Sequence, residues 1–410
     1  MEEPAEIEVV MEIGSQPILY FGIEIEFRAP RSPDEIEGVH SPEIAQDLTL
    51  YQLAMVVQAA GLPAACRAES FEYPTPDDLI NPLLNANGTT TRRGQALVID
   101  RDSLNNRRAS REFPYRHWFF KYEPNVSDEV YPEWIPVEVN SPIMTDEEVR
   151  SGLPTVGRAL RAIRNAIAPG VHIGERYGLH VHVSPKDGLT LGHAKQITTL
   201  VWLLEESLLY PLCAPGRKEV NVPLRVNYLF NCHCSDGLDP STEMRDHLPP
   251  SLLTHRPHTL KHLWETRTLG ELGMAINRKD DESNSQTFGL MIVDDTNDTG
   301  VSRPAMEFRY SQATFRIPHI HAWVAVILQI CRVAMLPAGL FRSALDDVQL
   351  IILGAHPPEE TWKRLLQSIE LYSGDNMGLD SAHLFWHSIL SRYEMGATRD
   401  VDANGIVVMY

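Results

Sequence analysis

Residues 178–183 constrain the fold most, because polar and apolar side chains alternate along them with a period of two. In a β-strand this period places His180 and His182 on one face and the three aliphatic side chains between and beside them on the other. The segment therefore predicts a strand with an apolar face toward a core and a polar face that is free for chemistry.

Three other segments, residues 22–27, 137–140 and 306–310, repeat this alternation. Their polar members are Glu24 and Glu26, Glu138 and Asn140, and Glu307 and Arg309. If the four strands share one sheet and turn their polar faces the same way, four glutamates, two histidines and one arginine gather on a single surface.

Four neighbouring carboxylates repel one another and raise one another's pKa values unless cations lie among them. Arg309 alone does not balance them, and a bound metal resolves the conflict. Ligand sets rich in oxygen with one or two imidazoles suit Mg²⁺ or Mn²⁺ better than a structural zinc, which favours cysteine and histidine. The sequence thus predicts a divalent metal site.

The composition narrows the classes of partner. The chain has 410 residues, of which 43% are hydrophobic, and this is enough for a sizeable core. A formal charge of −19 argues against nucleic acid or an anionic membrane as the main partner, since both require basic surfaces.

Five cysteines without a regular framework indicate a reducing compartment, and no apolar signal segment opens the chain. The most apolar run, residues 320–341, is interrupted by polar residues and a proline, so it reads as a buried helix. We expect a cytoplasmic protein, with the nucleus as the alternative.

Capping residues, prolines and periodicity predict the remaining elements. Thr145 and Glu148 read as a capping box that begins a helix broken at Pro154. The expected strands are 18–27, 98–99, 117–122, 134–140 and 273–277, and the expected helices are 42–60, 145–167, 190–210, 318–336, 359–371 and 381–392.

This pattern of strands and helices predicts one α+β domain over residues 16–400, with helices packed on the apolar back of the sheet. An acidic flexible N-terminus, residues 1–15, and a tail, residues 401–410, flank it. Two loop-rich insertions, at about 64–112 and 211–256, are expected to line the substrate entrance.

In their order along the chain, the four motifs resemble the amidoligase family of fungi and bacteria, from residue 18 to about residue 330. That family is similar to glutamine synthetase and glutamate–cysteine ligase. The resemblance implies a curved antiparallel sheet around an ATP site, two or three divalent ions, and a carboxylate–amine ligase reaction through an acyl phosphate. Its substrates would be an amino acid, peptide or related small molecule with a carboxylate, and an amine donor.

The resemblance also implies roles for individual residues. The implied metal ligands are Glu24, Glu26, Glu138, His180 and Glu307. The implied catalytic residues are Arg309, Glu138 and His182, and the implied ATP contacts are Arg309, Arg217, His182 and Asn277. Two departures from the family pattern, Glu123 in place of an aspartate and no histidine after Arg309, concern substrate contacts more than metal binding.

Two other classes of function stay open at this stage. One is a zinc metallohydrolase in which His180, His182 and a glutamate hold the ion and activate water. The other is a binding module that keeps the fold without catalysis. The sequence names neither the acid nor the amine, and it leaves the oligomeric state open.

Overall fold

The structure is a computed structural model, and it describes most of the chain. The described residues are 17–31, 42–68, 97–100, 116–126, 130–166, 169–222, 240–255, 257–276, 287–293, 304–378, 382–397, 400–403 and 405–408.

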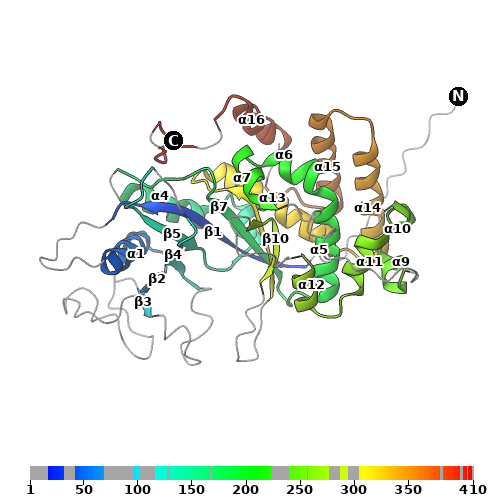
Figure 1. The fold of residues 1–410 in the computed structure, drawn as a ribbon, viewed down its shortest axis with the longest axis horizontal. Coiled ribbons are helices and arrows are strands. Elements are labelled where there is room, and N and C mark those ends of the chain that lie inside the picture. The colour runs from blue at the N-terminus through cyan, green and yellow to red at the C-terminus, as the bar shows by residue number, and fades with distance from the viewer. Residues whose placement is uncertain are drawn as a thin grey trace, which may run out of the picture.

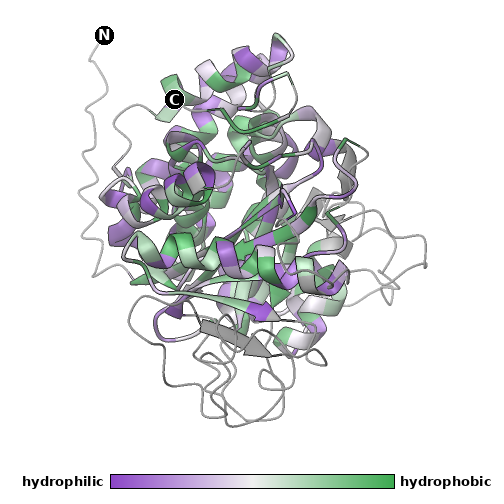
Figure 2. Ribbon diagram, turned by 90° about the vertical axis from the view of Figure 1, so that its left-hand side faces the viewer, coloured by the Kyte–Doolittle hydropathy of each residue, from purple (hydrophilic) through white to green (hydrophobic). Residues whose placement is uncertain are grey.

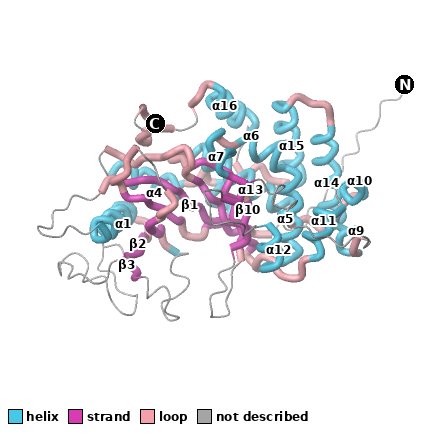
Figure 3. The backbone as a smooth tube through the Cα atoms, viewed as in Figure 1, coloured by secondary structure: helices cyan, strands magenta, loops and turns pink. Residues whose placement is uncertain are grey.

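A nine-stranded sheet lies at the centre of the fold (Figures 1 and 3). Its strand order is β10-β11-β7-β1-β5-β4-β2-β3, and β6 pairs with β1 off this path. The strands are β1 (Leu19–Ala29), β2 (Ala64–Ala68), β3 (Leu97–Asp100), β4 (Trp118–Tyr122), β5 (Ile135–Asn140), β6 (Met144–Thr145), β7 (Gly178–Pro185), β10 (Leu290–Val293) and β11 (Ala305–Gln312). A separate pair joins β8 (Asn221–Val222) to β9 (Thr287–Phe288).

The α+β class is confirmed, but the prediction of a purely antiparallel sheet is wrong. The strands from β10 to β4 pair antiparallel, whereas β2 runs parallel to both β4 and β3. Strand β2 was not predicted, because its five residues, AACRA, lack an alternating pattern of polar and apolar side chains. Helix α1 (Pro42–Ala59) connects β1 to β2 and brings the chain back so that β2 runs in the same direction as β1 and β4.

Helices cover the apolar face of the sheet, and further helices lie beyond one end of the sheet (Figure 1). Helix α1 packs on β2, β4 and β5, and α13 packs on β7 and α5. Figure 2 shows apolar residues concentrated where helices and strands face each other. The helices are α1 (Pro42–Ala59), α3 (Asp146–Arg150), α4 (Pro154–Ala166), α5 (Leu191–Leu204), π-helical η2 (Glu205–Leu209), α6 (Tyr210–Leu212), α7 (Pro215–Val220), α9 (Thr242–His247), α10 (Pro250–His255), α11 (Pro257–Glu265), α12 (Leu269–Ile276), α13 (Ile317–Ala334), α14 (Ala338–Leu353), α15 (Pro358–Ser373) and α16 (Ala382–Glu394).

Helix α13 is the only helix among the described residues that is long and apolar enough to cross a membrane, and 89% of it is buried inside the protein. It lies in the core, as the sequence predicted for this apolar run.

Several local predictions fail for physical reasons. Thr145 makes no side-chain cap at α3. Glu148 instead accepts hydrogen bonds from the backbone N–H groups of Thr155, at 2.6 Å, and Val156, so it caps α4. The strand expected at 273–277 is the end of α12, because apolar runs this short fit either structure. Helices α7, α9 and α10 lie in the segment expected to be loops.

A buried ion-pair network ties α3, α13 and the segment after α15 together. Arg332 of α13 is 5% exposed and bridges two carboxylates. It donates to Asp146 at the start of α3 and, at 2.7 Å, to Asp375 beyond α15. Arg150, which is partly exposed, contacts the same two carboxylates from α3.

We expect Arg332→Met to destabilise the fold by roughly 3–5 kcal/mol, because it leaves two carboxylates without their buried partner while keeping the volume. Arg150→Met is the matched control and should cost less than about 1 kcal/mol, since that guanidinium is partly solvated. Urea unfolding measures both free energies. Equal losses in the two variants would contradict a dominant role for the buried partner.

His319 of α13 is held neutral in the core. Its ring is 2% exposed and packs edge-on against Phe385 and Trp386. Gln312 donates a hydrogen bond to Nε2 at 3.2 Å, which suits the neutral ring. Burial lowers the pKa of His319 to about 4, and the nearby charge of Asp400 only partly opposes this shift.

This shift predicts a loss of stability in acid. The unfolded histidine takes up a proton near pH 6.5 and the folded one only near pH 4, so unfolding binds a proton between these values. Stability is therefore retained above pH 6.5 and falls as the pH drops toward 4, by roughly 3 kcal/mol from this group. His319→Gln should remove that part of the pH slope in urea titrations at several pH values. An unchanged slope would show that other groups cause the acid sensitivity.

Candidate functional site

The sheet places the four predicted polar strands side by side, in the order β11-β7-β1-β5. Glu24 of β1 lies opposite His180 on one side and Asn140 on the other. Glu26 lies opposite Glu138. On the outer side of β7, His182 lies opposite Glu307 of β11. The alternating side chains therefore meet on one face, as the sequence predicted.

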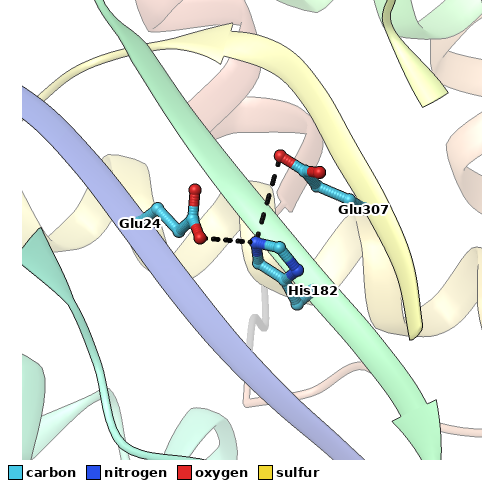
Figure 4. A group of neighbouring side chains, drawn as sticks. All are labelled: Glu24, His182 and Glu307. Atoms are coloured by element: carbon cyan, nitrogen blue, oxygen red, sulfur yellow. Dashed lines mark ion pairs between the residues drawn. The ribbon is translucent and has the colours of Figure 1, made fainter. Parts of the chain in front are cut away.

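Three side chains form a group with metal-binding spacing. One ligand atom from each of Glu24, His182 and Glu307 lies within 4.8 Å of the other two. Figure 4 shows the three side chains pointing toward one another from β1, β7 and β11. Nε2 of His182 is 3.0 Å from Oε1 of Glu24 and 4.0 Å from Oε1 of Glu307.

His180 lies deeper, beneath this group, and is 1% exposed. Its Nδ1 is 3.1 Å from Oε2 of Glu24 and 3.4 Å from Oε1 of Glu307. Its Nε2 is 3.7 Å from Oε1 of Glu26. The ring thus faces three carboxylates and fixes their relative positions, whereas the sequence assigned the ligand role to His180 and the supporting role to His182.

Gly178 makes room for this histidine. A Cβ at position 178 would lie 2.3 Å from Nε2 of His180 and 3.1 Å from Nη2 of Arg217, so glycine is needed for the close approach. The backbone N–H of Gly178 also donates a 2.5 Å hydrogen bond to Glu26. The Gly-x-His-x-His pattern was visible in the sequence, but only the structure shows what the glycine does.

Glu138 has a cation of its own, which the sequence analysis missed. Lys121 of β4 lies opposite Glu138 in the register, and its Nζ is 2.7 Å from Oε1 of Glu138. Asn140 donates to both Glu138, at 3.0 Å, and Glu24, at 2.5 Å. Glu138 therefore lies at the lysine side of the cluster and outside the group with metal-binding spacing.

The electrostatics of the face follow from burial and neighbouring charge. Burial, and then the charge of Glu24, holds the pKa of Glu138 well above its usual range despite Lys121. Burial would also raise the pKa of Glu24, but the charge of His182 and a hydrogen bond with His180 outweigh it and hold that pKa well below its usual range. For His182, burial alone would lower the pKa, and the charges of Glu24 and Glu307 raise it instead.

Two arginines border the cluster. The guanidinium of Arg309 contacts Glu307 at 2.5 Å, and a β-bulge between Phe308 and Ser311 shifts the register of β11 beside it. Arg217 of α7 is 2% exposed and donates to the backbone oxygens of Arg309, at 2.6 Å, and Arg176. Burial lowers its pKa to about 10, so it stays charged at neutral pH.

The donor set fits a hard divalent cation. Two carboxylates and one imidazole converge, and Nε2 of His182 is buried without a hydrogen bond of acceptable geometry. When this nitrogen gives up its proton, its lone pair can bind a metal ion between the carboxylates. The residues that would hold the ion are Glu24, His182 and Glu307, with oxygen ligands in the majority, as Mg²⁺ and Mn²⁺ prefer.

Some predicted residues lie elsewhere. Asn277 falls outside the described residues. Sequence reasoning did not single out Glu205, which is fully buried and accepts a 2.9 Å hydrogen bond from Tyr310. Glu205 lies in η2, a π-helical turn that simple helical periodicity does not predict.

We expect Gly178→Ala to lower the affinity for Mn²⁺ by at least about tenfold, because the new methyl group displaces His180 beneath the ligands. Calorimetric titration with Mn²⁺ measures this effect, with circular dichroism as the check of folding. Gly192→Ala in α5 is the matched control, since its Cβ would meet nothing closer than 3.9 Å. Wild-type affinity in Gly178→Ala would contradict the positioning role of His180.

Comparison with known proteins adds a family. The model of the family described as "putative amidoligase enzyme" matches residues 17–219, from the start of β1, which carries Glu24, into α7, which carries Arg217. No curated protein matches the chain. Glu307 and Arg309 follow the matched segment, and the sheet brings them next to the matched residues. The chain therefore belongs to the amidoligase family and is, by family, an enzyme of the ligase class.

Proposed function

We propose that this protein is an ATP- and Mg²⁺-dependent carboxylate–amine ligase that acts through an acyl phosphate. The observation that carries the proposal is the group of Glu24, His182 and Glu307 beside Arg309 on one face of the sheet. Family membership supports amide-bond formation as the reaction class. We also propose that the sheet corresponds to the curved catalytic sheet of glutamine synthetase and glutamate–cysteine ligase.

The chemistry explains why such residues are needed. A carboxylate resists attack by an amine, so it is first phosphorylated by ATP, and the amine then displaces phosphate. When bound, the divalent ion would neutralise charge on the β- and γ-phosphates. Glu24, His182 and Glu307 would hold that ion on three adjacent strands, which keeps their relative positions fixed.

The two arginines have separate tasks in this proposal. Arg309 lies next to the ion-binding group and, as a planar guanidinium, would bind the equatorial oxygens of the transferred phosphoryl group. Arg217 is buried and occupied by two backbone oxygens, so it would hold the strand of Arg309 in place more than it touches nucleotide. The substrate would be a small molecule or peptide with a carboxylate, in the cytoplasm, and not nucleic acid.

One observation favours a second candidate. A group of three protein ligands is also the number found in catalytic zinc sites, where a fourth position holds water. Zinc hydrolysis would use the same His182 and glutamates. It gives no task to Arg309, whose guanidinium lies against Glu307.

The first experiment titrates Mg²⁺ and a non-hydrolysable ATP analogue into the protein by calorimetry. We expect nucleotide binding that requires Mg²⁺ and is weakened by roughly a hundredfold in Glu24→Gln and Glu307→Gln, because each removes one ligand charge. Glu147→Gln is the matched control, since that side chain is 73% exposed and lies outside the cluster.

The outcomes separate the candidates. Mg²⁺-dependent nucleotide binding by the wild type, followed by ADP release with mixtures of carboxylates and amines, would support the ligase. Tight zinc without nucleotide binding would support the hydrolase. A wild type that binds neither metal nor nucleotide would refute both, and leave a module without catalysis.

A further inference from the structure

A hollow lies on the side of the sheet opposite the carboxylate cluster, between α4, the start of α13 and the C-terminal segment. Its volume is about 340 Å³, within the usual range of small-ligand pockets. Phe315 in its wall packs edge-on against Phe27 of β1, with ring centroids 5.5 Å apart. Phe27 belongs to the apolar face of β1, so the hollow is behind the carboxylate cluster and separate from it.

Arginines give the hollow a local positive charge. Arg161 and Arg164 of α4 and Arg316 before α13 line it, in a chain with a formal charge of −19. Arg316 lies 3.8 Å from Asp400, the one acidic residue in the wall, which also accepts a 2.8 Å hydrogen bond from Arg392. Neither Arg161 nor Arg164 has a carboxylate partner among the described residues, and Arg164 contacts only the amide of Asn165, at 3.4 Å.

The guanidinium of Arg161 lies next to Gly157, which also lines the hollow. Gly157 lies inside α4, where glycine weakens a helix relative to alanine. A Cβ there would lie 3.4 Å from Nη1 of Arg161 and 3.6 Å from the side chain of Ile317. Both distances are ordinary van der Waals contacts, so they show that the guanidinium of Arg161 and the start of α13 lie next to Gly157 in the wall of the hollow.

The rest of the wall is apolar. Leu160 and Val407 are buried, and Phe315 and Ile317 stand beside them. A guanidinium binds carboxylate or phosphate through paired N–H donors, and a buried apolar wall favours an aromatic or aliphatic group. We propose that this hollow, which we call the arginine pocket, binds a small organic anion with a carboxylate or phosphate head and a compact apolar body.

The test uses probes that separate head from body. Phenyl phosphate and benzoate carry both features, inorganic phosphate carries only the head, and benzyl alcohol only the body. Calorimetric titrations of the full chain, with EDTA present, should show binding of phenyl phosphate or benzoate that is tighter than that of either partial probe. Higher salt should weaken it, because the contact is ionic and partly exposed.

The helix offers a matched control. We expect Arg161→Gln and Arg164→Gln each to weaken binding by at least about tenfold, since each removes charge-assisted hydrogen bonds. Arg158→Gln changes the same charge on the same helix outside the pocket and should leave binding unchanged. The side chains at all three positions, 158, 161 and 164, are solvent-accessible, so these variants should fold.

Other outcomes would overturn the proposal. Failure of every probe to bind the wild type at about millimolar concentration would do so, as would equal loss in Arg158→Gln. Binding abolished by Glu24→Gln would place the probe at the carboxylate cluster instead. Because metal and ATP are absent from this experiment, its failure leaves the proposed ligase activity untouched, and the reverse also holds.

Discussion

Repulsion among carboxylates on β1 and its neighbours is the constraint on which the functional face depends. Glu24 lies at its centre and contacts Asn140, His180 and His182. Each of these contacts offers a donor or a positive charge to a group that burial would otherwise neutralise. The face therefore stays anionic where His182 and Glu307 meet Glu24, and that retained charge is what a divalent ion requires.

The sequence was enough to predict which residues share the polar face of the sheet, but not how those residues are placed relative to one another. Alternation with a period of two reveals which residues share a side of a strand, and this was enough for Glu24, His182 and Glu307. Pairing order and register depend on contacts between distant segments, so the lysine opposite Glu138 and the need for Gly178 stayed hidden. The alternation likewise does not reveal that His180 is buried and His182 partly exposed, because both lie on the same face of β7.

The two faces of the sheet share one rigid frame. The apolar residues of β1, such as Ile23 and Ile25, are buried to 1% exposure or less under the helices. Because side chains on one strand alternate between faces, packing on the apolar side fixes the carboxylates on the other. Phe27, which follows Glu26 directly, carries this connection to Phe315 and so to the wall of the arginine pocket.

Lys121 explains why the group with metal-binding spacing is at one end of the cluster. Lys121 lies 2.7 Å from Glu138, and burial together with the charge of Glu24 holds the pKa of that carboxyl well above its usual range, so Glu138 offers an ion less negative charge than Glu24 does. At the other end, Arg309 of β11 contacts Glu307. The two ends of the cluster therefore differ: Glu138 lies against Lys121, whereas Glu24, His182 and Glu307 have the spacing of metal ligands. In the proposed ligase, an ion held by Glu24, His182 and Glu307 would lie beside Arg309, where a transferred phosphoryl group would also need to be.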